Sequence, residues 1–363
     1  MGIVNTKAGA DSHARRIRQS PEGPRQIVLV LQGGGALGAY QAGVYQALHE
    51  AGIEPDWVIG TSIGAINASL IAGNRVEDRL PRLQQFWRRM EHADPWGMAS
   101  VLPRLSEKVS YWTTVMSGIQ GFFEPNALAF WGASVRLGAE HAGYYSTAPL
   151  RKTLLELVDF SLVGECTPRL TVGTAQVRTG KMRYFDSRDG NLAVEHVLAS
   201  GALPPAFPAV RIDGELYWDG GILSNTPVEV VFEEDPHRNS LVFAVHVWRP
   251  EGAEPETIGE VLHRQKDVQY ASRIAAQIER QREVHRLRHV ISELVQQLPE
   301  ERRNSPAVRE LSDYGCLSRM HVVRLVAPRL DVENHTKDID FSRSGIQMRW
   351  EAGYADTCRS LQR

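Results

Sequence analysis

The sequence predicts an α/β fold of three layers, α/β/α, built around a mainly parallel sheet. Two glycine-rich turns support this prediction, because each stands between an apolar run and a helical pattern. The first turn, residues 33–38, follows the apolar run 27–31. The second turn, residues 60–64, follows the run 57–59. Strand–turn–helix units that repeat along a chain are typical of a parallel sheet with helices on both faces.

The alternation of strand and helix patterns extends from residue 26 to residue 249, which we predict to be one domain. Helical patterns follow the two turns, at residues 37–51 and 63–72, and a glycine ends each of them. Further apolar runs predict strands at residues 170–175, 182–185, 216–218 and 241–248.

Residues 91–145 interrupt this alternation. They are rich in Trp, Phe, Tyr and Gly and weak in periodicity, so we predict an insertion that contains helices. Its aromatic residues either form part of a cover over the site or complete the core under a long loop. The sequence supports these two interpretations equally.

A linker rich in Pro and Glu, residues 250–255, opens the C-terminal region 250–363, which we predict to be helical and to pack on the domain. Residues 257–298 have apolar residues at helical spacing. We also predict a strand at 320–327 and a terminal helix at 350–361.

The long C-terminal helix carries seven Lys/Arg against three Asp/Glu between His263 and His289. One interpretation is a basic face that binds anionic lipid at a membrane surface. The interpretation we favour is that the apolar stripe packs on the domain or on a second copy of the chain, while the arginines face water.

Composition and charge limit the class of protein. Of the 363 residues, 42% are hydrophobic and 23% charged, and the net charge is −2. These values are ordinary for a soluble globular protein and give no reason to expect nucleic acid as a partner. The three cysteines, Cys166, Cys316 and Cys358, show no C-x-x-C spacing. We therefore predict neither a disulfide framework nor a metal site.

The first 25 residues are polar and basic, and we predict a disordered basic tail, residues 1–25. They contain no apolar core of the kind that a signal peptide needs. No run of about 18 uncharged apolar residues, as a membrane-spanning helix requires, is present in the sequence. Together with the few cysteines, these features favour a cytoplasmic protein and leave peripheral membrane contact open.

Ser62 is the candidate nucleophile. It stands between Gly60 and Gly64 in a G-x-S-x-G sequence. The glycines allow the sharp turn that exposes a serine between the end of a strand and the start of a helix. The helix N-terminus also favours negative charge nearby. A purely structural turn is the alternative for this motif, and the strand–helix context makes that alternative weaker.

The glycine loop of Gly33, Gly34, Gly35 and Gly38 has two interpretations. It satisfies G-x-G-x-x-G, the motif of dinucleotide-binding oxidoreductases, which also needs an acidic residue at the end of the next strand. That place is occupied here by the turn that contains Ser62. We favour the second interpretation, an oxyanion hole in which the N–H groups of Gly34 and Gly35 point at a developing negative charge.

Asp219 is the candidate base, because it ends a predicted strand and is followed by Gly220 and Gly221. A carboxylate that is close to the serine and partly desolvated can accept the serine proton directly. No histidine stands where a Ser–Asp–His order requires one: His246 lies within an apolar strand, and His196 lies in a helical pattern. A plain turn is the alternative for Asp-Gly-Gly taken alone.

These motifs, in this order, resemble the patatin-like phospholipase family. Residues 199–208 are similar to its A-S-x-A-x-P-x-x-F-P segment, and Asn225 and Pro227 are similar to its Asn-x-Pro after the aspartate. The resemblance covers residues 26–247. One position departs from it, because Leu37 stands where the family's loop usually has Arg or Lys.

The resemblance implies a patatin-like catalytic domain at 26–249 and a serine acyl-hydrolase, of lipase or phospholipase A type, that cleaves lipid esters. The implied machinery is a Ser62–Asp219 dyad without histidine, cofactor or metal. Residues 40–45 are similar to a bacterial branch that carries its own C-terminal region.

Several alternatives stay open. Because of Leu37, polyester oligomers and esters other than phospholipids are alternative substrates. A dinucleotide-binding oxidoreductase and a catalytically silent lipid-binding protein are alternatives of other classes. The expected partners are a lipid or other ester but no nucleic acid, with membrane contact and a homo-oligomer through the C-terminal helix left open.

Overall fold

The computed structural model describes residues 26–91, 118–132, 134–165, 168–330, 333 and 335–362. The predicted tail at 1–25 and residues 92–117 of the predicted insertion lie outside the described residues. Within the described part of the chain, none of the helices combines the length and the apolar character needed to cross a bilayer.

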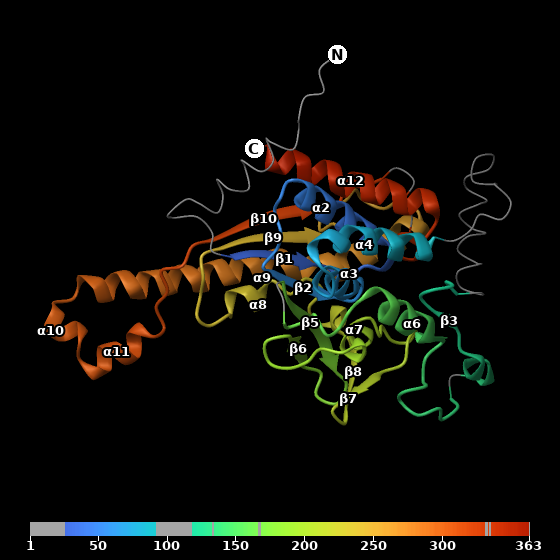
Figure 1. Cartoon of the computed structure of the whole chain (residues 1–363), viewed down its shortest axis with the longest axis horizontal. Coiled ribbons are helices and arrows are strands. Elements are labelled where there is room, and N and C mark those ends of the chain that lie inside the picture. Colours follow the sequence, from blue (N-terminus) through green and yellow to red (C-terminus); the bar gives the residue numbers. More distant parts are fainter. Residues whose placement is uncertain are drawn as a thin grey trace, which may run out of the picture.

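A sheet of eight strands forms the centre of the molecule (Figure 1). Its strands are β1 (Gln26–Leu31), β2 (Trp57–Thr61), β5 (Arg169–Gln176), β6 (Met182–Asp186), β7 (Val210–Ile212), β8 (Glu215–Asp219), β9 (Ser240–His246) and β10 (Met320–Val326). The order along the main path is β10-β9-β1-β2-β5-β8-β7, and β6 also pairs with β5. The first five strands of this path are mutually parallel, whereas β6, β7 and β8 form antiparallel pairs.

Helices cover both faces of the sheet (Figure 1). The α-helices are α2 (Ala39–Glu50), α3 (Ile63–Ala72), α4 (Val76–Met90), α6 (Ala148–Leu157), α7 (Val194–Ser200), α8 (Glu229–Phe232), α9 (Ile258–Gln297), α10 (Glu300–Arg303), α11 (Pro306–Ser312) and α12 (Arg343–Leu361). The short 3₁₀ helices are η1 (Gly35–Gly38), η3 (Ala127–Trp131), η4 (Gly220–Ile222) and η5 (Lys337–Ile339), and a separate two-stranded pair joins β3 (Glu124–Pro125) to β4 (Tyr145–Ser146). The predicted α/β fold with a mainly parallel sheet is confirmed.

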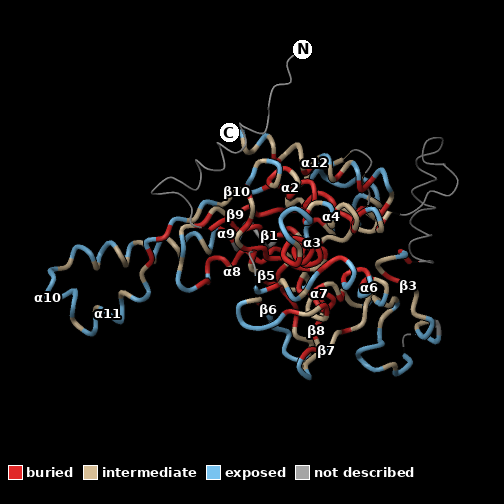
Figure 2. Tube along the Cα trace, viewed as in Figure 1, coloured by how far each residue is buried: buried red, intermediate tan, exposed pale blue. Residues whose placement is uncertain are grey.

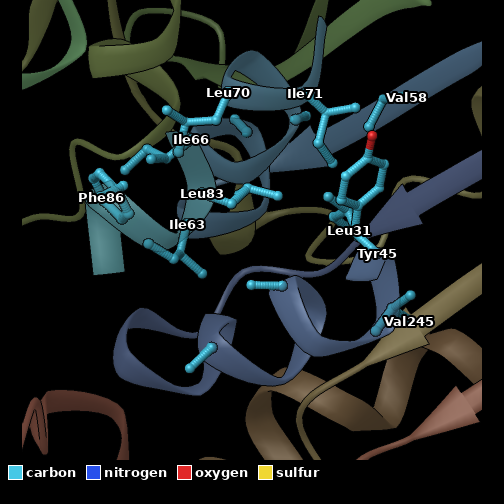
Figure 3. Close-up of a cluster of buried hydrophobic side chains, with 14 of the residues drawn as sticks. Leu31, Tyr45, Val58, Ile63, Ile66, Leu70, Ile71, Leu83, Phe86 and Val245 are labelled. Carbon is cyan, nitrogen blue, oxygen red and sulfur yellow. The ribbon is translucent and has the colours of Figure 1, made fainter. Parts of the chain in front are cut away.

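Two hydrophobic cores lie on opposite faces of the sheet, because alternate side chains of a strand point to opposite sides. On one face, Leu29 and Leu31 of β1 pack with α2, α3, α4 and α12. Figure 3 shows part of this core, in which Ile63 and Phe86 belong to α3 and α4. On the other face, Val28 and Val30 pack with residues of α8 and α9. Figure 2 shows the buried residues concentrated in this central sandwich.

Helix α9 has 40 residues and serves two different surroundings. Its start is fixed by a capping box: the N–H of Glu260 donates to Thr257 Oγ1 (3.2 Å), and the N–H of Thr257 donates to Glu260 Oε2 (2.9 Å). The first half covers the sheet. The second half projects from the body together with α10 and α11 (Figure 1), and this projection is largely exposed (Figure 2).

The last segments of the chain complete the central sandwich. Strand β10 pairs with β9 at the edge of the sheet, and α12 packs on α2. The two helices touch through their backbones: a Cβ atom on Gly43 would lie 1.9 Å from the carbonyl oxygen of Trp350, and one on Gly353 would lie 2.0 Å from that of Tyr40. The terminal helix, which was predicted at residues 350–361, begins earlier in the structure, at Arg343.

Gly43→Ala tests this contact. The added methyl group meets backbone atoms rather than the end of a flexible side chain, so the helices must separate, and overpacking of this kind typically costs about 1–3 kcal/mol. We expect a lower free energy of unfolding in urea. Gly259→Ala in α9 is the control, since the nearest atom to its Cβ is Thr257 Oγ1 at 3.9 Å. Equal stability of both variants and the wild type would show that α2 and α12 do not pack this closely.

Candidate active site

Strand β2 ends directly before Ser62, and helix α3 begins directly after it. Ser62 has φ 57° and ψ −128°, a backbone conformation that residues other than glycine rarely adopt. The glycines on either side are required by space: a Cβ on Gly60 would lie 2.3 Å from the backbone of Gly64, and one on Gly64 would lie 2.2 Å from the Leu31 carbonyl oxygen. The predicted sharp turn is thus present.

Asp219 ends strand β8 and is 2% exposed. Its Oδ1 accepts a hydrogen bond from the N–H of Gly221 (2.7 Å), and the Ser62 side chain lies close enough to the carboxylate to affect its pKa. Burial raises the pKa of Asp219 to about 7, and the nearby Ser62 side chain and the N–H of Gly221 act in the opposite direction. A carboxylate of this kind is a stronger base than an exposed one, and it lies near the serine side chain.

The register of the sheet explains why these two residues meet. Strand β6 pairs with residues 171–175 of β5. These residues overlap both those that pair with β2 (169–173) and those that pair with β8 (174–176). Because each edge of a strand holds one partner at a time, β2 and β8 share the other edge of β5. β2 leaves this edge at Gly173 and β8 arrives from the opposite direction at Thr174. Ser62 and Asp219 therefore lie where the two strand ends meet.

The segment 199–208 contacts both candidate residues. The N–H of Ser62 donates to Ser200 Oγ (2.9 Å), and the Ser200 hydroxyl donates to the carbonyl oxygen of Gly173 (2.7 Å). The N–H of Asp219 donates to the carbonyl oxygen of Ala202 (3.0 Å). Ser200 was not among the predicted site residues, and its motif was the signal that could have identified it.

Gly33 lies against the serine. A Cβ on Gly33 would be 2.9 Å from Ser62 Cβ and 2.4 Å from Asn225 Oδ1. The N–H of Gly33 donates to the carbonyl oxygen of Asn225 (3.1 Å), and its own carbonyl oxygen accepts from Asn225 Nδ2 (3.2 Å) and Trp248 Nε1 (2.8 Å). Gly33 is thereby fixed in place, and its N–H is already used.

The other glycines of the loop differ from one another. Among the described residues, no hydrogen bond from the N–H of Gly34 or Gly35 is found. Gly35 has φ 56°, and a Cβ there would lie 2.2 Å from the carbonyl oxygen of Asp338. Gly38 packs on the start of α3, since its Cβ would lie 2.5 Å from Ile63 Cγ1.

Leu37 is buried. It lines a cavity of about 690 Å³ that also includes Lys337 and Arg349 but neither Ser62 nor Asp219. The glycine loop has no cation at position 37, and the buried Lys337 of the C-terminal region lines the same cavity as Leu37.

Tyr270 of α9 lies beside the site and was not predicted from the sequence. Its carbonyl oxygen accepts from Gln32 Nε2 (3.3 Å) and from Asn225 Nδ2 (3.5 Å), and its ring centroid lies 5.0 Å from that of Trp248. Burial and the negative charges of Asp219 and Asp338 raise the pKa of the Tyr270 phenol, which keeps its proton at neutral pH.

A buried carboxyl group supports the turn that follows Asp219. Glu229 Oε1 accepts from Ser224 Oγ (2.6 Å) and from the hydroxyl of Tyr184. Burial raises the pKa of Glu229, and its second oxygen has no partner within the described ranges. Among the described residues there is no group of three His, Cys, Asp or Glu that could hold a metal ion.

The fold and the proximity of Ser62 and Asp219 define an α/β protein with a serine and a carboxylate beside a glycine loop. Comparison with known families adds the particular class. A family model described as patatin-like phospholipase matches residues 29–232, and a second one described as patatin phospholipase matches residues 268–363. The chain belongs to the patatin-like phospholipase family.

Curated relatives match a limited part of their own length. Lysophospholipase nte1 of Aspergillus terreus is 31% identical over 245 residues, which are 66% of this chain and 13% of that protein. Patatin-like phospholipase domain-containing protein 6 of Homo sapiens is 27% identical over 239 residues, which are 65% of this chain and 14% of that protein. This chain therefore spans about one seventh of the length of such relatives.

Solved structures show a weaker likeness. VipD from Legionella pneumophila is 17% identical with a TM-score of 0.40, over 94% of this chain and 67% of that one. Human GIVD cytosolic phospholipase A2 is 10% identical with a TM-score of 0.38, over 99% of this chain and 64% of that one.

Asp219→Asn tests the buried carboxylate through its effect on stability. A carboxyl group whose pKa is higher in the folded than in the unfolded chain binds its proton more tightly when folded. Its ionisation therefore destabilises the fold as the pH rises from about 4 to about 7. We expect the variant to be more stable than the wild type at pH 8, by at most about 4 kcal/mol, and to lose this advantage at pH 4.

Urea denaturation at both pH values measures the difference. Asp159→Asn is the matched control with the opposite sign, because hydrogen bonds from Ser161 lower the pKa of this exposed carboxyl. That control should lose stability relative to the wild type above pH 4. A difference between Asp219→Asn and the wild type that is independent of pH would contradict the raised pKa.

Proposed function

We propose that the chain is a carboxylic ester hydrolase that cleaves lipid esters through a Ser62–Asp219 dyad. The single observation that carries the proposal is the position of the Ser62 side chain beside the buried carboxylate of Asp219, close enough to lower its pKa. The family membership and the names of the curated relatives, which are lysophospholipases and phospholipase-domain proteins, support a lipid ester as the substrate.

In the proposed reaction, Ser62 Oγ attacks the ester carbonyl carbon while Asp219 takes the serine proton. The N–H groups of Gly34 and Gly35 hold the oxyanion, and Gly33 and Gly38 shape the loop. Collapse of the tetrahedral intermediate releases the alcohol, which receives the proton from Asp219. Water then attacks the acyl-serine while the same carboxylate takes its proton. The free acid leaves, and Asp219 returns the proton to Ser62 Oγ.

The alternatives are weighed by the same contacts. A dinucleotide-binding oxidoreductase fits poorly, because the N–H of Gly33 is bonded to Asn225 and the backbone of Gly35 lies against Asp338. Polyester oligomers and esters other than phospholipids stay as alternative substrates, since Leu37 brings no cation to the loop. A panel of phospholipids, lysolipids, acylglycerols and soluble esters distinguishes them by hydrolysis rate.

A serine-reactive fluorophosphonate probe tests the dyad. We expect the wild type to be labelled and Ser62→Ala to remain unlabelled, because the activated hydroxyl is the group that reacts. Asp219→Asn should fold and hydrolyse esters about 10²–10⁴-fold more slowly, which is the usual contribution of a general base. A well-folded wild type without label would point to the catalytically silent lipid-binding protein.

For partners, we propose a second copy of the chain, bound through the projecting arm formed by the outer half of α9, α10 and α11. We define this arm as residues 281–319. Large apolar side chains are exposed on it: Leu287 (59%), Leu294 (57%), Leu311 (61%) and Tyr314 (68%). An isolated arm of this kind cannot bury its own apolar surface, so a covering partner is expected.

The charges of the arm favour protein over lipid. Residues 281–319 contain seven Arg, no Lys and six Asp/Glu. So small an excess of positive charge gives little attraction to anionic lipid, whereas arginine without lysine is typical of protein interfaces. Peripheral membrane contact is the alternative.

The location we propose is cytoplasmic, which the low cysteine content supports and which cell fractionation tests.

Light scattering after gel filtration tests the proposed arm contact. We expect a dimer for the wild type and a monomer for Leu287→Glu/Leu294→Glu, because two buried charges would oppose the contact. Leu155→Glu is the control, since Leu155 is also exposed (51%) but lies on α6. A monomeric wild type that sediments with anionic vesicles, and no longer does so in the double variant, would favour the membrane interpretation instead.

A further inference from the structure

Two neighbouring residues of α9 and two of η5 form a pair of crossed ion pairs. Lys266 Nζ lies 2.6 Å from Asp338 Oδ1, and Lys337 Nζ lies 2.8 Å from Asp267 Oδ1. Each segment contributes one lysine followed by one aspartate, so each segment supplies both charges. We call this arrangement the crossed clamp, and it joins α9 to η5 at two points.

The two ion pairs of the crossed clamp differ in burial. Lys337 and Asp267 have side chains 4% and 8% exposed, and His263 Nε2 lies 3.3 Å from the other oxygen of Asp267. Lys266 and Asp338 are 34% and 22% exposed and can be exchanged without leaving a charge in the core. A buried pair of this kind is weak evidence for stability, and its better attested effect is to fix the position of the segments it joins.

The crossed clamp is in contact with the glycine loop from two sides. The carbonyl oxygen of Asp338 lies where a Cβ of Gly35 would be, at 2.2 Å. Lys337 Nζ lies 5.1 Å from the ring centroid of Trp248, and Trp248 Nε1 donates to the carbonyl oxygen of Gly33 (2.8 Å). Any displacement of η5 therefore changes the surroundings of Gly35, and any displacement of Lys337 changes the support of Gly33.

The same part of α9 also supports the turn after Asp219. Tyr270 lies one helical turn after Lys266, and its carbonyl oxygen accepts from Asn225 Nδ2 (3.5 Å). Asn225 in turn holds both backbone polar groups of Gly33. The glycine loop is thus enclosed by residues of α9, η5 and the segment that follows β8.

We propose that the crossed clamp positions the N–H groups of Gly34 and Gly35 for catalysis, so that the C-terminal region is a working part of the active site. Lys266, Asp267, Lys337 and Asp338 are then positioning residues that do not touch the substrate. The inference rests on the proposed ester hydrolysis for its kinetic effect, but the loop geometry that it describes can be measured without any substrate.

Reversal of the exposed pair is the test. In Lys266→Asp and in Asp338→Lys, like charges face each other, η5 moves, and kcat should fall roughly 10–100-fold, as expected for donors displaced by a fraction of an ångström to one ångström. KM should change little, because substrate binding does not require these donors. The double variant Lys266→Asp/Asp338→Lys restores an ion pair and should recover most of kcat.

Hydrogen–deuterium exchange of the peptide covering residues 33–38 gives the second readout. The single variants should exchange faster than the wild type in this peptide, and the double variant should return to the wild-type rate. Glu279→Lys is the control, because it breaks the exposed pair of Glu279 and Arg282 on the same helix, and it should leave both kcat and the exchange of 33–38 unchanged.

The outcomes separate this inference from the proposed function. Unchanged exchange of residues 33–38 in both single variants, or a folded double variant that recovers neither exchange nor kcat, overturns the clamp. Exchange that rises and recovers as expected, in a chain whose Ser62 does not react with fluorophosphonate, supports the clamp and rejects the ester hydrolysis. A melting temperature well above the assay temperature in every variant excludes global unfolding as the cause.

Discussion

The close approach of backbones at the end of strand β2 is the constraint on which the site depends. Gly64 lies against the Leu31 carbonyl oxygen, Gly60 lies against Gly64, and Gly33 lies against Ser62, each at a distance that leaves no room for a Cβ atom. These contacts hold Ser62 at φ 57°, a conformation that costs about 1–3 kcal/mol unless its surroundings enforce it. The positions of α3 and of the glycine loop follow from the same contacts.

A second destabilising feature, the buried carboxylate of Asp219, lies beside the strained backbone of Ser62. Asp219 is 2% exposed, and within the described part of the chain no cation lies among its hydrogen-bonding partners. The sheet supports both residues through a single strand, because β5 carries β2 and β8 end to end along one edge. Stability is thus lost locally, at a strained serine and a desolvated carboxylate, and is supplied by the two cores on either side of the sheet.

The sequence predicted the strands, helices and turns better than the contacts between distant segments. The glycine turns, the parallel strands and the long helix follow from local patterns, and Ser62 and Asp219 follow from their turns. The shared edge of β5 has no local signature, because it depends on register between three segments that are far apart in the sequence, residues 57–61, 169–176 and 217–219. Tyr270 and the pair of Lys337 and Asp267 were missed for the same reason, since each looks like an ordinary helix or loop residue until distant segments meet.

The backbone contact between α2 and α12 affects the order of assembly during synthesis. Helix α2 is made early, but Gly43 and Tyr40 meet their partners only when Trp350 and Gly353 have left the ribosome. Strand β10 likewise reaches β9 after the whole of α9 has been made. A nascent chain therefore carries an uncovered helix face and an open sheet edge through much of its synthesis, which is the kind of surface that holdase chaperones bind.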